Sequence, residues 1–210
     1  MPIIRKLSDV AEGLAYLHTK HTVHGDLKGV SVSSGSRSVV LISFYQSNVL
    51  ISRRGRARLT DFGFTSVVRG LNSVLVPELQ GCTLRWAAPE VIRGEGGSTQ
   101  EADIYAFAMV VIEVGPLTSL RLVPDAEQLT ICHYILLKVF TGKCPFSELT
   151  DPVAVSEIME GERPDRPQER DLTNPVWDMT VCCWQEDPVL RPRVERVVVN
   201  LREWQVFSLA

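Results

Sequence analysis

The stretch that decides the fold is His24-Gly25-Asp26-Leu27-Lys28. Three further short motifs follow it along the chain, namely Asn48, then Asp61-Phe62-Gly63, then Ala88-Pro89-Glu90. A single aspartate in such a setting most often caps a helix or a turn. Four such elements in one order are much more specific than any one of them, so we interpret them together.

With these motifs the chain resembles the eukaryotic protein kinase family. Kinases catalyse phosphoryl transfer mainly by positioning the reactants and neutralising charge. The resemblance implies that Asp26 accepts the proton of the substrate hydroxyl and that Lys28 lies against the transferring phosphoryl group. It implies further that Asn48 and Asp61 bind the Mg²⁺ ions of ATP, because oxygen atoms are the ligands that this hard cation prefers.

Other residues of the pattern are assigned structural roles. We expect His24 to be a packed histidine rather than a general base. Phe62 and Gly63 follow Asp61, and the glycine lets the backbone turn sharply so that the carboxylate can face the metal.

Two longer-range features strengthen the resemblance. Asp103, in ADIYAFAM, matches the aspartate that begins the family's buried central helix. In the family this aspartate binds the backbone of the catalytic loop, which the resemblance places here at residues 24–28. Arg191, in DPVLRP, matches the arginine that pairs with the glutamate of the third motif, here Glu90. The ending around residues 183–192 is similar to the tyrosine-kinase-like branch of the family.

The hydrophobic pattern predicts a mainly α (α+β) domain, which the resemblance makes a protein kinase-like C-terminal lobe. The apolar residues between 3 and 17 recur at helical spacing, and residues 102–114 form an apolar helix. Helices are predicted near residues 152–160, 175–185 and 193–206. Residues 49–52 and 57–60 flank a glycine turn and predict a small β-hairpin at the catalytic loop.

Composition and charge exclude several classes of protein. The chain is 45% hydrophobic and 22% charged with a net charge of −3, which gives no reason to expect nucleic acid or membrane as a partner. Its five cysteines lack metal-ligand spacing and indicate reduced thiols of an intracellular, most simply cytoplasmic, protein. No signal peptide or transmembrane segment is predicted. The partners that the resemblance implies are a nucleotide and a protein substrate.

One departure from the family pattern lies in the catalytic loop itself. Gly25 stands where the family usually has an arginine between the histidine and the aspartate. Because that arginine normally holds a phosphorylated activation loop, we do not expect loop phosphorylation to control this protein.

Two segments interrupt the family pattern, at residues 30–46 and 114–138, so that the kinase-like domain over residues 1–210 is discontinuous. Deleting the 17 residues 30–46 places Asn48 five positions after Asp26, the family spacing. Deleting the 25 residues 114–138 joins AFAMVVIE to VFTGKCPF. Both segments begin with Val and end with Gln or Lys, whose codons can supply the GT and AG that bound an intron. We hypothesise retained introns or gene-model errors, in a compact genome such as a fungal one.

The third departure is that no glycine-rich phosphate loop and no strand lysine precede residue 24, so we expect the N-terminal β-lobe to be missing. The predicted function is ATP- and Mg²⁺-dependent phosphorylation of protein Ser/Thr hydroxyls, with Tyr less favoured, by a domain that is incomplete and inactive as written. The alternative is a non-catalytic kinase-like lobe that binds proteins through the face around residues 61–90.

Overall fold

The structure, a computed structural model, describes residues 2–28, 48–51, 56–62, 84–95, 97–113, 144–167 and 172–207. The first element is helix α1 (Pro2–Thr19), whose apolar stripe forms because its apolar residues recur every three or four positions. The buried members of that stripe are Ile4, Leu7, Val10, Ala11, Leu14 and Leu17. The stripe packs on the C-terminal helix α9 (Val194–Phe207) and on the hairpin.

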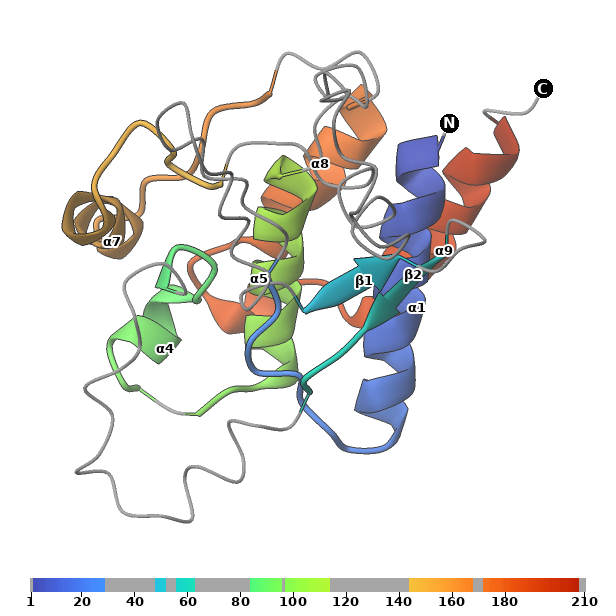
Figure 1. The fold of residues 1–210 in the computed structure, drawn as a ribbon, viewed down its shortest axis with the longest axis horizontal. Helices are drawn as coiled ribbons and strands as arrows, with labels where there is room; N and C mark the ends of the chain where they lie inside the picture. Colours follow the sequence, from blue (N-terminus) through green and yellow to red (C-terminus); the bar gives the residue numbers. More distant parts are fainter. Residues whose placement is uncertain are drawn as a thin grey trace, which may run out of the picture.

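Helix α5 (Gln100–Ile112) lies at the centre of the described structure, between α1 and α9 on one side and α4 and α7 on the other (Figure 1). Thr99 caps its first turn, since the Thr99 hydroxyl oxygen accepts the Ala102 N–H at 3.1 Å. All its residues from Ala102 through Ile112 are buried. A helix that is apolar on every side belongs inside a core, as the sequence predicts for this segment.

The β-hairpin consists of β1 (Val49–Ile51) and β2 (Ala57–Leu59), which pair antiparallel with Val49 opposite Leu59. It lies against α1, and two contacts fix it there. The Asp9 carboxylate on α1 accepts the Ala57 N–H at 2.9 Å. A Cβ atom on Gly13 would lie 3.1 Å from the Leu59 side chain, so the glycine permits the close approach of helix and strand.

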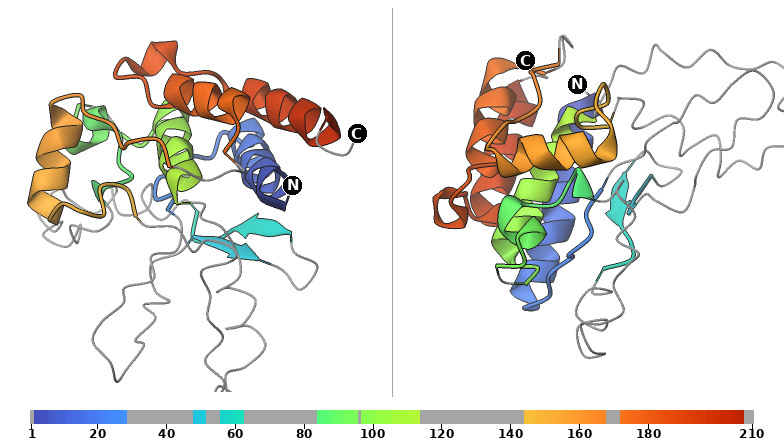
Figure 2. Two further views of the ribbon diagram at one scale, coloured as in Figure 1. Left: turned by 90° about the horizontal axis from the view of Figure 1, so that it is seen from above. Right: turned by 90° about the vertical axis from the view of Figure 1, so that its left-hand side faces the viewer.

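The remaining elements surround α5. They are α4 (Pro89–Ile92), α7 (Asp151–Met159), α8 (Asn174–Cys183) and the 3₁₀ helix η3 (Pro188–Leu190). Figure 2 shows α4 and α7 together at the end of the molecule farthest from α9. Among the described residues, no helix is long and apolar enough to cross a membrane.

The predicted helices and the hairpin are confirmed, with bounds that differ by a few residues. The sequence did not predict α4 and η3, because each is a single short turn begun by a proline, with too few residues to show a period. The two interrupting segments, 30–46 and 114–138, lie outside the described residues, as does Gly63.

Candidate active site

The carboxylate of Asp26 is held on one of its two oxygens. Its Oδ2 atom accepts a hydrogen bond from Asn48 Nδ2 at 2.9 Å and lies 3.0 Å from Lys28 Nζ. Asn48 Nδ2 also donates to the Asp26 carbonyl oxygen at 2.5 Å. The other carboxylate oxygen, Oδ1, is buried and has no hydrogen-bond partner among the described residues. The three side chains therefore form one cluster, in which Asp26 Oδ1 is a buried acceptor without a partner among the described residues.

Asn48 reaches this cluster because the backbone on both sides of it is bonded. Its own N–H donates to the Lys28 carbonyl at 3.3 Å, and its carbonyl accepts the Thr60 N–H at 2.9 Å. The side chain is buried, with Asn48 only 4% exposed. The start of β1 is thus fixed between the catalytic loop and the end of β2.

Asp61 follows the end of β2 and has a left-handed backbone, with φ of 56°. Its side chain is exposed and accepts a long hydrogen bond, 3.4 Å, from the Thr60 hydroxyl. Because Thr60 is bonded to Asn48, the two predicted metal ligands stand at neighbouring ends of the hairpin. Phe62 is 53% exposed, and its structural role stays a prediction.

Asp103, on the first turn of α5, anchors the catalytic loop. Its Oδ2 atom accepts the His24 N–H at 2.8 Å, and its Oδ1 atom accepts the Gly25 N–H at 2.9 Å. This is the backbone contact expected at that position from the family pattern. A third contact was not expected: His18 Nε2 lies 2.9 Å from Asp103 Oδ2, and both side chains are buried.

The contact between His18 and Asp103 could not be predicted from the sequence. His18 lies in the last turn of α1, 85 positions before Asp103, so no spacing in the sequence could relate them. His24, by contrast, is a packed residue, fully buried, whose Nδ1 atom accepts the Asp26 N–H at 3.3 Å. Burial lowers the pKa of the His24 imidazole, which favours the neutral form that this acceptor role requires.

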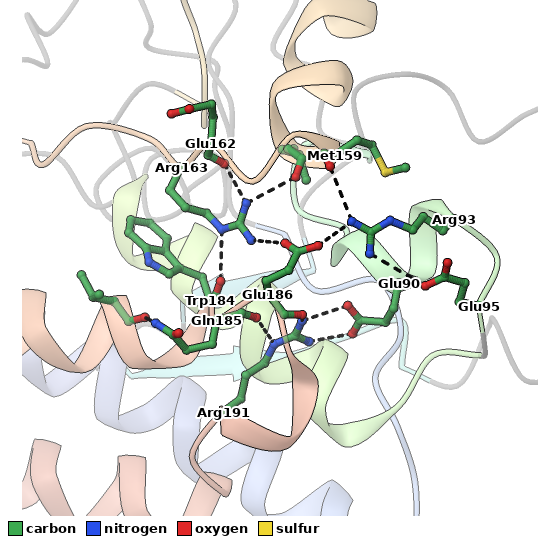
Figure 3. Close-up of polar contacts among 12 residues, drawn as sticks. Glu90, Arg93, Glu95, Met159, Glu162, Arg163, Trp184, Gln185, Glu186 and Arg191 are labelled. Atoms are coloured by element: carbon green, nitrogen blue, oxygen red, sulfur yellow. Dashed lines mark hydrogen bonds and ion pairs between the residues drawn. The ribbon is translucent and has the colours of Figure 1, made fainter.

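A second polar cluster ties α4 to the turn before α9 (Figure 3). Arg191 donates to Glu90 through both terminal nitrogens, at 2.6 and 2.8 Å, and both residues are buried. Beside this pair, the Glu186 carboxylate accepts hydrogen bonds from Arg93 and Arg163. The two arginine–glutamate groups together join α4, the segment after α7 and the turn at residues 184–191.

Comparison with known proteins identifies the family. Residues 2–201 match the model of the family described as protein tyrosine and serine/threonine kinase. The chain belongs to this kinase family. The resemblance to eukaryotic protein kinases of the tyrosine-kinase-like kind is thereby confirmed.

The kinase domain has similar relatives in plants and fungi. It is 27% identical over 203 residues to serine/threonine-protein kinase STY17 of Arabidopsis thaliana, covering 96% of the chain and 27% of the relative. It is 26% identical over 199 residues to mitogen-activated protein kinase kinase kinase 3 of the same plant, covering 94% of the chain and 25% of the relative. It is 28% identical over 201 residues to cytokinesis protein sepH of Aspergillus niger, covering 93% of the chain and 11% of the relative. The chain therefore spans about a quarter or less of the length of these relatives.

Sequence reasoning did not predict how the segment just before the motif Ala88-Pro89-Glu90 is attached to the rest of the domain. Arg85 is buried, and its guanidinium donates to the carbonyls of Pro145, Phe146 and Leu149 and to the Asp151 carboxylate. The only signal in the sequence was a charged residue within an otherwise apolar stretch. Its partners lie 60 or more positions away, so they could not be inferred.

The neighbouring residue, Trp86, makes a second contact that attaches this segment to the domain. The Trp86 indole N–H donates to Glu113 Oε2 at 2.9 Å, at the C-terminal end of α5.

A hollow lies between residues 25–27 of the catalytic loop, residues 86–88 and helix α5. Its lining includes Asp26, Leu27, Ala88 and Ala106.

Proposed function

We propose that this chain is the C-terminal lobe of a protein kinase that transfers the terminal phosphoryl group of ATP to a protein Ser or Thr hydroxyl. The observation that carries the proposal is the different hydrogen bonding of the two oxygen atoms of the Asp26 carboxylate. One oxygen is bound by Asn48 and Lys28, while the other is an acceptor without a partner among the described residues. A substrate hydroxyl is a donor that matches the remaining oxygen, which is buried in this structure and has to be uncovered before a hydroxyl can reach it.

Asp26 acts on the attacking group. A hydroxyl that donates to its Oδ1 atom is oriented for in-line attack, and its proton has an acceptor as the oxygen bonds to phosphorus. The contact of Asn48 with both the carboxylate and the carbonyl of Asp26 restricts the direction of that carboxylate. Lys28 supplies a positive charge next to the reacting oxygen, which offsets the negative charge of the transferring group.

The residues present fit Mg²⁺ and nucleotide phosphates. Asn48 donates its amide N–H₂ group to Asp26, which leaves the amide oxygen to serve as a ligand. The Asp61 carboxylate is exposed beside it at the end of the hairpin. Both are hard oxygen ligands, so Asn48 and Asp61 would hold the cation. When bound, Mg·ATP supplies the phosphoryl group and neutralises charge on its oxygens.

The preference for Ser and Thr over Tyr is supported by Lys28, two positions after Asp26, and by the printed names of the relatives, which include serine/threonine kinases. The free cysteines Cys182 and Cys183 support an intracellular location.

We further propose that residues 30–46 and 114–138 are insertions into this lobe. The Lys28 carbonyl accepts the Asn48 N–H. If residues 30–46 are removed, only Gly29 and Ser47 separate these two residues, and the same hydrogen bond becomes the first-to-fourth bond of a β-turn. The described ends of the segment are therefore already spaced for direct connection. At the second segment, α5 ends at Ile112 with Glu113 buried, before residue 114 is reached.

These 210 residues contain no glycine-rich phosphate loop or strand lysine, so we propose that they do not phosphorylate a substrate on their own. The test uses the longest protein that the locus encodes, read from its transcript and purified. It is incubated with Mg·ATP and three peptide pools whose sole hydroxyl residue is Ser, Thr or Tyr. Phosphate on the Ser and Thr pools is the expected result. Incorporation into the Tyr pool alone would contradict the preference for Ser and Thr. Incorporation into none of the pools would contradict the proposal and favour the protein-binding alternative.

A further inference from the structure

Asp9, in the middle of α1, uses its two carboxylate oxygens on two successive residues of the hairpin. Its Oδ1 atom lies 2.5 Å from Arg56 Nη2, and its Oδ2 atom accepts the Ala57 N–H at 2.9 Å. The Asp9 side chain is only 3% exposed. Because it is shielded from water, a lost hydrogen bond here is not replaced by solvent. Helix α1 therefore holds β2 at the residue where this strand begins.

A second contact between α1 and β2 lies one helical turn further along. A Cβ atom on Gly13 would lie 3.1 Å from the Leu59 side chain, so the two backbones approach closely at this point. Asp9 and Gly13 are about 6 Å apart along the helix axis. Ala57 and Leu59 are about 6.8 Å apart along the strand. The two spacings nearly match, so the pair of contacts sets the position of β2 along α1, beside which it lies in Figure 1.

The other end of the same strand leads to the two predicted metal ligands. Thr60, directly after β2, donates its N–H to the Asn48 carbonyl at 2.9 Å, and Asp61 is the next residue. Each strand has three residues, and a two-stranded hairpin is only marginally stable without a surface to pack on. A shift of β2 along α1 therefore moves Asn48 and Asp61 as well.

We infer that Asp9 is a positioning residue for the Mg²⁺ ligands Asn48 and Asp61. It acts through the Ala57 N–H, which fixes β2 on α1. Loss of the acceptor at position 9 loosens the hairpin and weakens the metal site, while the site for the protein substrate is unchanged. This role in metal binding rests on the proposed function, whereas the hold of Asp9 on the hairpin does not.

Three variants separate this role from a general loss of stability. Asp9→Leu keeps a side chain of similar size and removes the acceptor. Asp9→Asn keeps a neutral acceptor for the Ala57 N–H, so it should restore the position of β2. The matched control is Val176→Ala, because Val176 is buried on α8, outside α1 and the hairpin, and its truncation destabilises the domain there.

The first measurement uses the 210-residue chain. It follows hydrogen exchange of the Ala57 and Thr60 amides and the ¹H–¹⁵N signals of the Asn48 side chain. In Asp9→Leu both amides should exchange about tenfold faster relative to those of α5, and the Asn48 signals should move. Asp9→Asn should stay close to the wild type in both respects. Val176→Ala should leave the Asn48 signals in place.

The second measurement uses the longest protein that the locus encodes. The Mg²⁺ concentration for half-maximal phosphoryl transfer should rise about tenfold in Asp9→Leu, since a displaced ligand binds the cation less well. The KM for the peptide should stay as in the wild type, and Asp9→Asn should restore the Mg²⁺ requirement. A general loss of folded protein would lower the rate without changing this requirement.

Unchanged exchange of both amides in Asp9→Leu, or Asn48 signals that move equally in Val176→Ala, would overturn the inference. So would an unchanged Mg²⁺ requirement in an active Asp9→Leu enzyme. If Asp9→Leu does not fold, the wild-type chain decides: its Ala57 amide must exchange as slowly as its Thr60 amide, and rapid exchange of Ala57 overturns the inference. A wild-type protein without transferase activity contradicts the proposed function alone, and the amides then decide the hold of Asp9 on the hairpin.

Discussion

Arg191 donates two hydrogen bonds, of 2.6 and 2.8 Å, to the two oxygens of the Glu90 carboxylate, although it lies 101 residues further along the chain. The guanidinium also donates to the carbonyls of Gln185, Glu101 and Glu186, and lies over the Tyr105 ring at 5.1 Å. Every donor direction of the arginine is used in a buried setting. The pair therefore joins α4 to α5 and to the turn before α9.

Replacement of Arg191 by Met should destabilise the protein strongly. The substitution leaves the buried Glu90 carboxylate without its partner, which costs about 3–5 kcal/mol. Urea unfolding measures the change. The matched control is Arg202→Met, since Arg202 forms an exposed pair with Glu12 and should cost about 1 kcal/mol or less. Equal losses for the two variants would contradict the distinction between the buried and the exposed pair.

Replacement of Arg85 by Lys should also destabilise the protein, although the charge is kept. A lysine ammonium cannot reproduce the planar fork that serves three carbonyls and Asp151 at once. Loss of these charge-assisted bonds should cost about 1.5–3 kcal/mol by thermal or urea unfolding. Arg58→Lys, on the exposed side of β2, is the control and should be nearly neutral. A neutral Arg85→Lys would show that the fork is not needed.

The buried His24 should make stability depend on pH. Burial lowers its pKa below the usual 6.5, so the unfolded chain takes up a proton more readily than the folded one. The contribution of His24 to the free energy of unfolding is thus complete above about pH 6.5 and declines as the pH falls below that value. The free energy of unfolding of wild type minus that of His24→Gln should therefore decrease between pH 7.5 and 5. A difference that is constant or grows towards acid pH would be inconsistent with a neutral His24.

Local patterns predicted the longer helices and the hairpin of this fold but not α4 and η3, and the resemblance to kinases predicted that Asp26, Lys28 and Asn48 belong to one site. Apolar spacing was enough for α1, because a helix of 18 residues shows its period, and an apolar run of helical length was enough for α5. The contacts of His18 with Asp103 and of Arg85 with Asp151 could not be predicted. Each joins residues 66 or more positions apart whose types permit many partners, and only tertiary packing selects among them.

Removal of residues 30–46 should preserve the cluster and stabilise the protein. The connection from Lys28 to Asn48 shortens from 19 linking residues to two, which lowers the loop-closure cost by about 2 kcal/mol. The melting temperature should rise by about 4–8 °C. The control removes residues 29–46 and leaves one linking residue, which permits the hydrogen bond between Lys28 and Asn48 only in a tighter γ-turn, so it should melt below the two-residue variant. Equal melting temperatures of the two deletions would contradict the β-turn connection.

The role of Asp26 is tested most directly by phosphoryl transfer in the longest protein that the locus encodes. We compare Asp26→Asn with Asp187→Asn, because Asp187 is an exposed aspartate that caps η3 away from the cluster. The initial rate of phosphate transfer from Mg·ATP to a Ser or Thr peptide should fall about 10²–10⁴-fold in Asp26→Asn and stay near wild type in Asp187→Asn. A rate for Asp26→Asn within a few-fold of wild type would contradict the assignment of Asp26 as the residue that accepts the substrate proton.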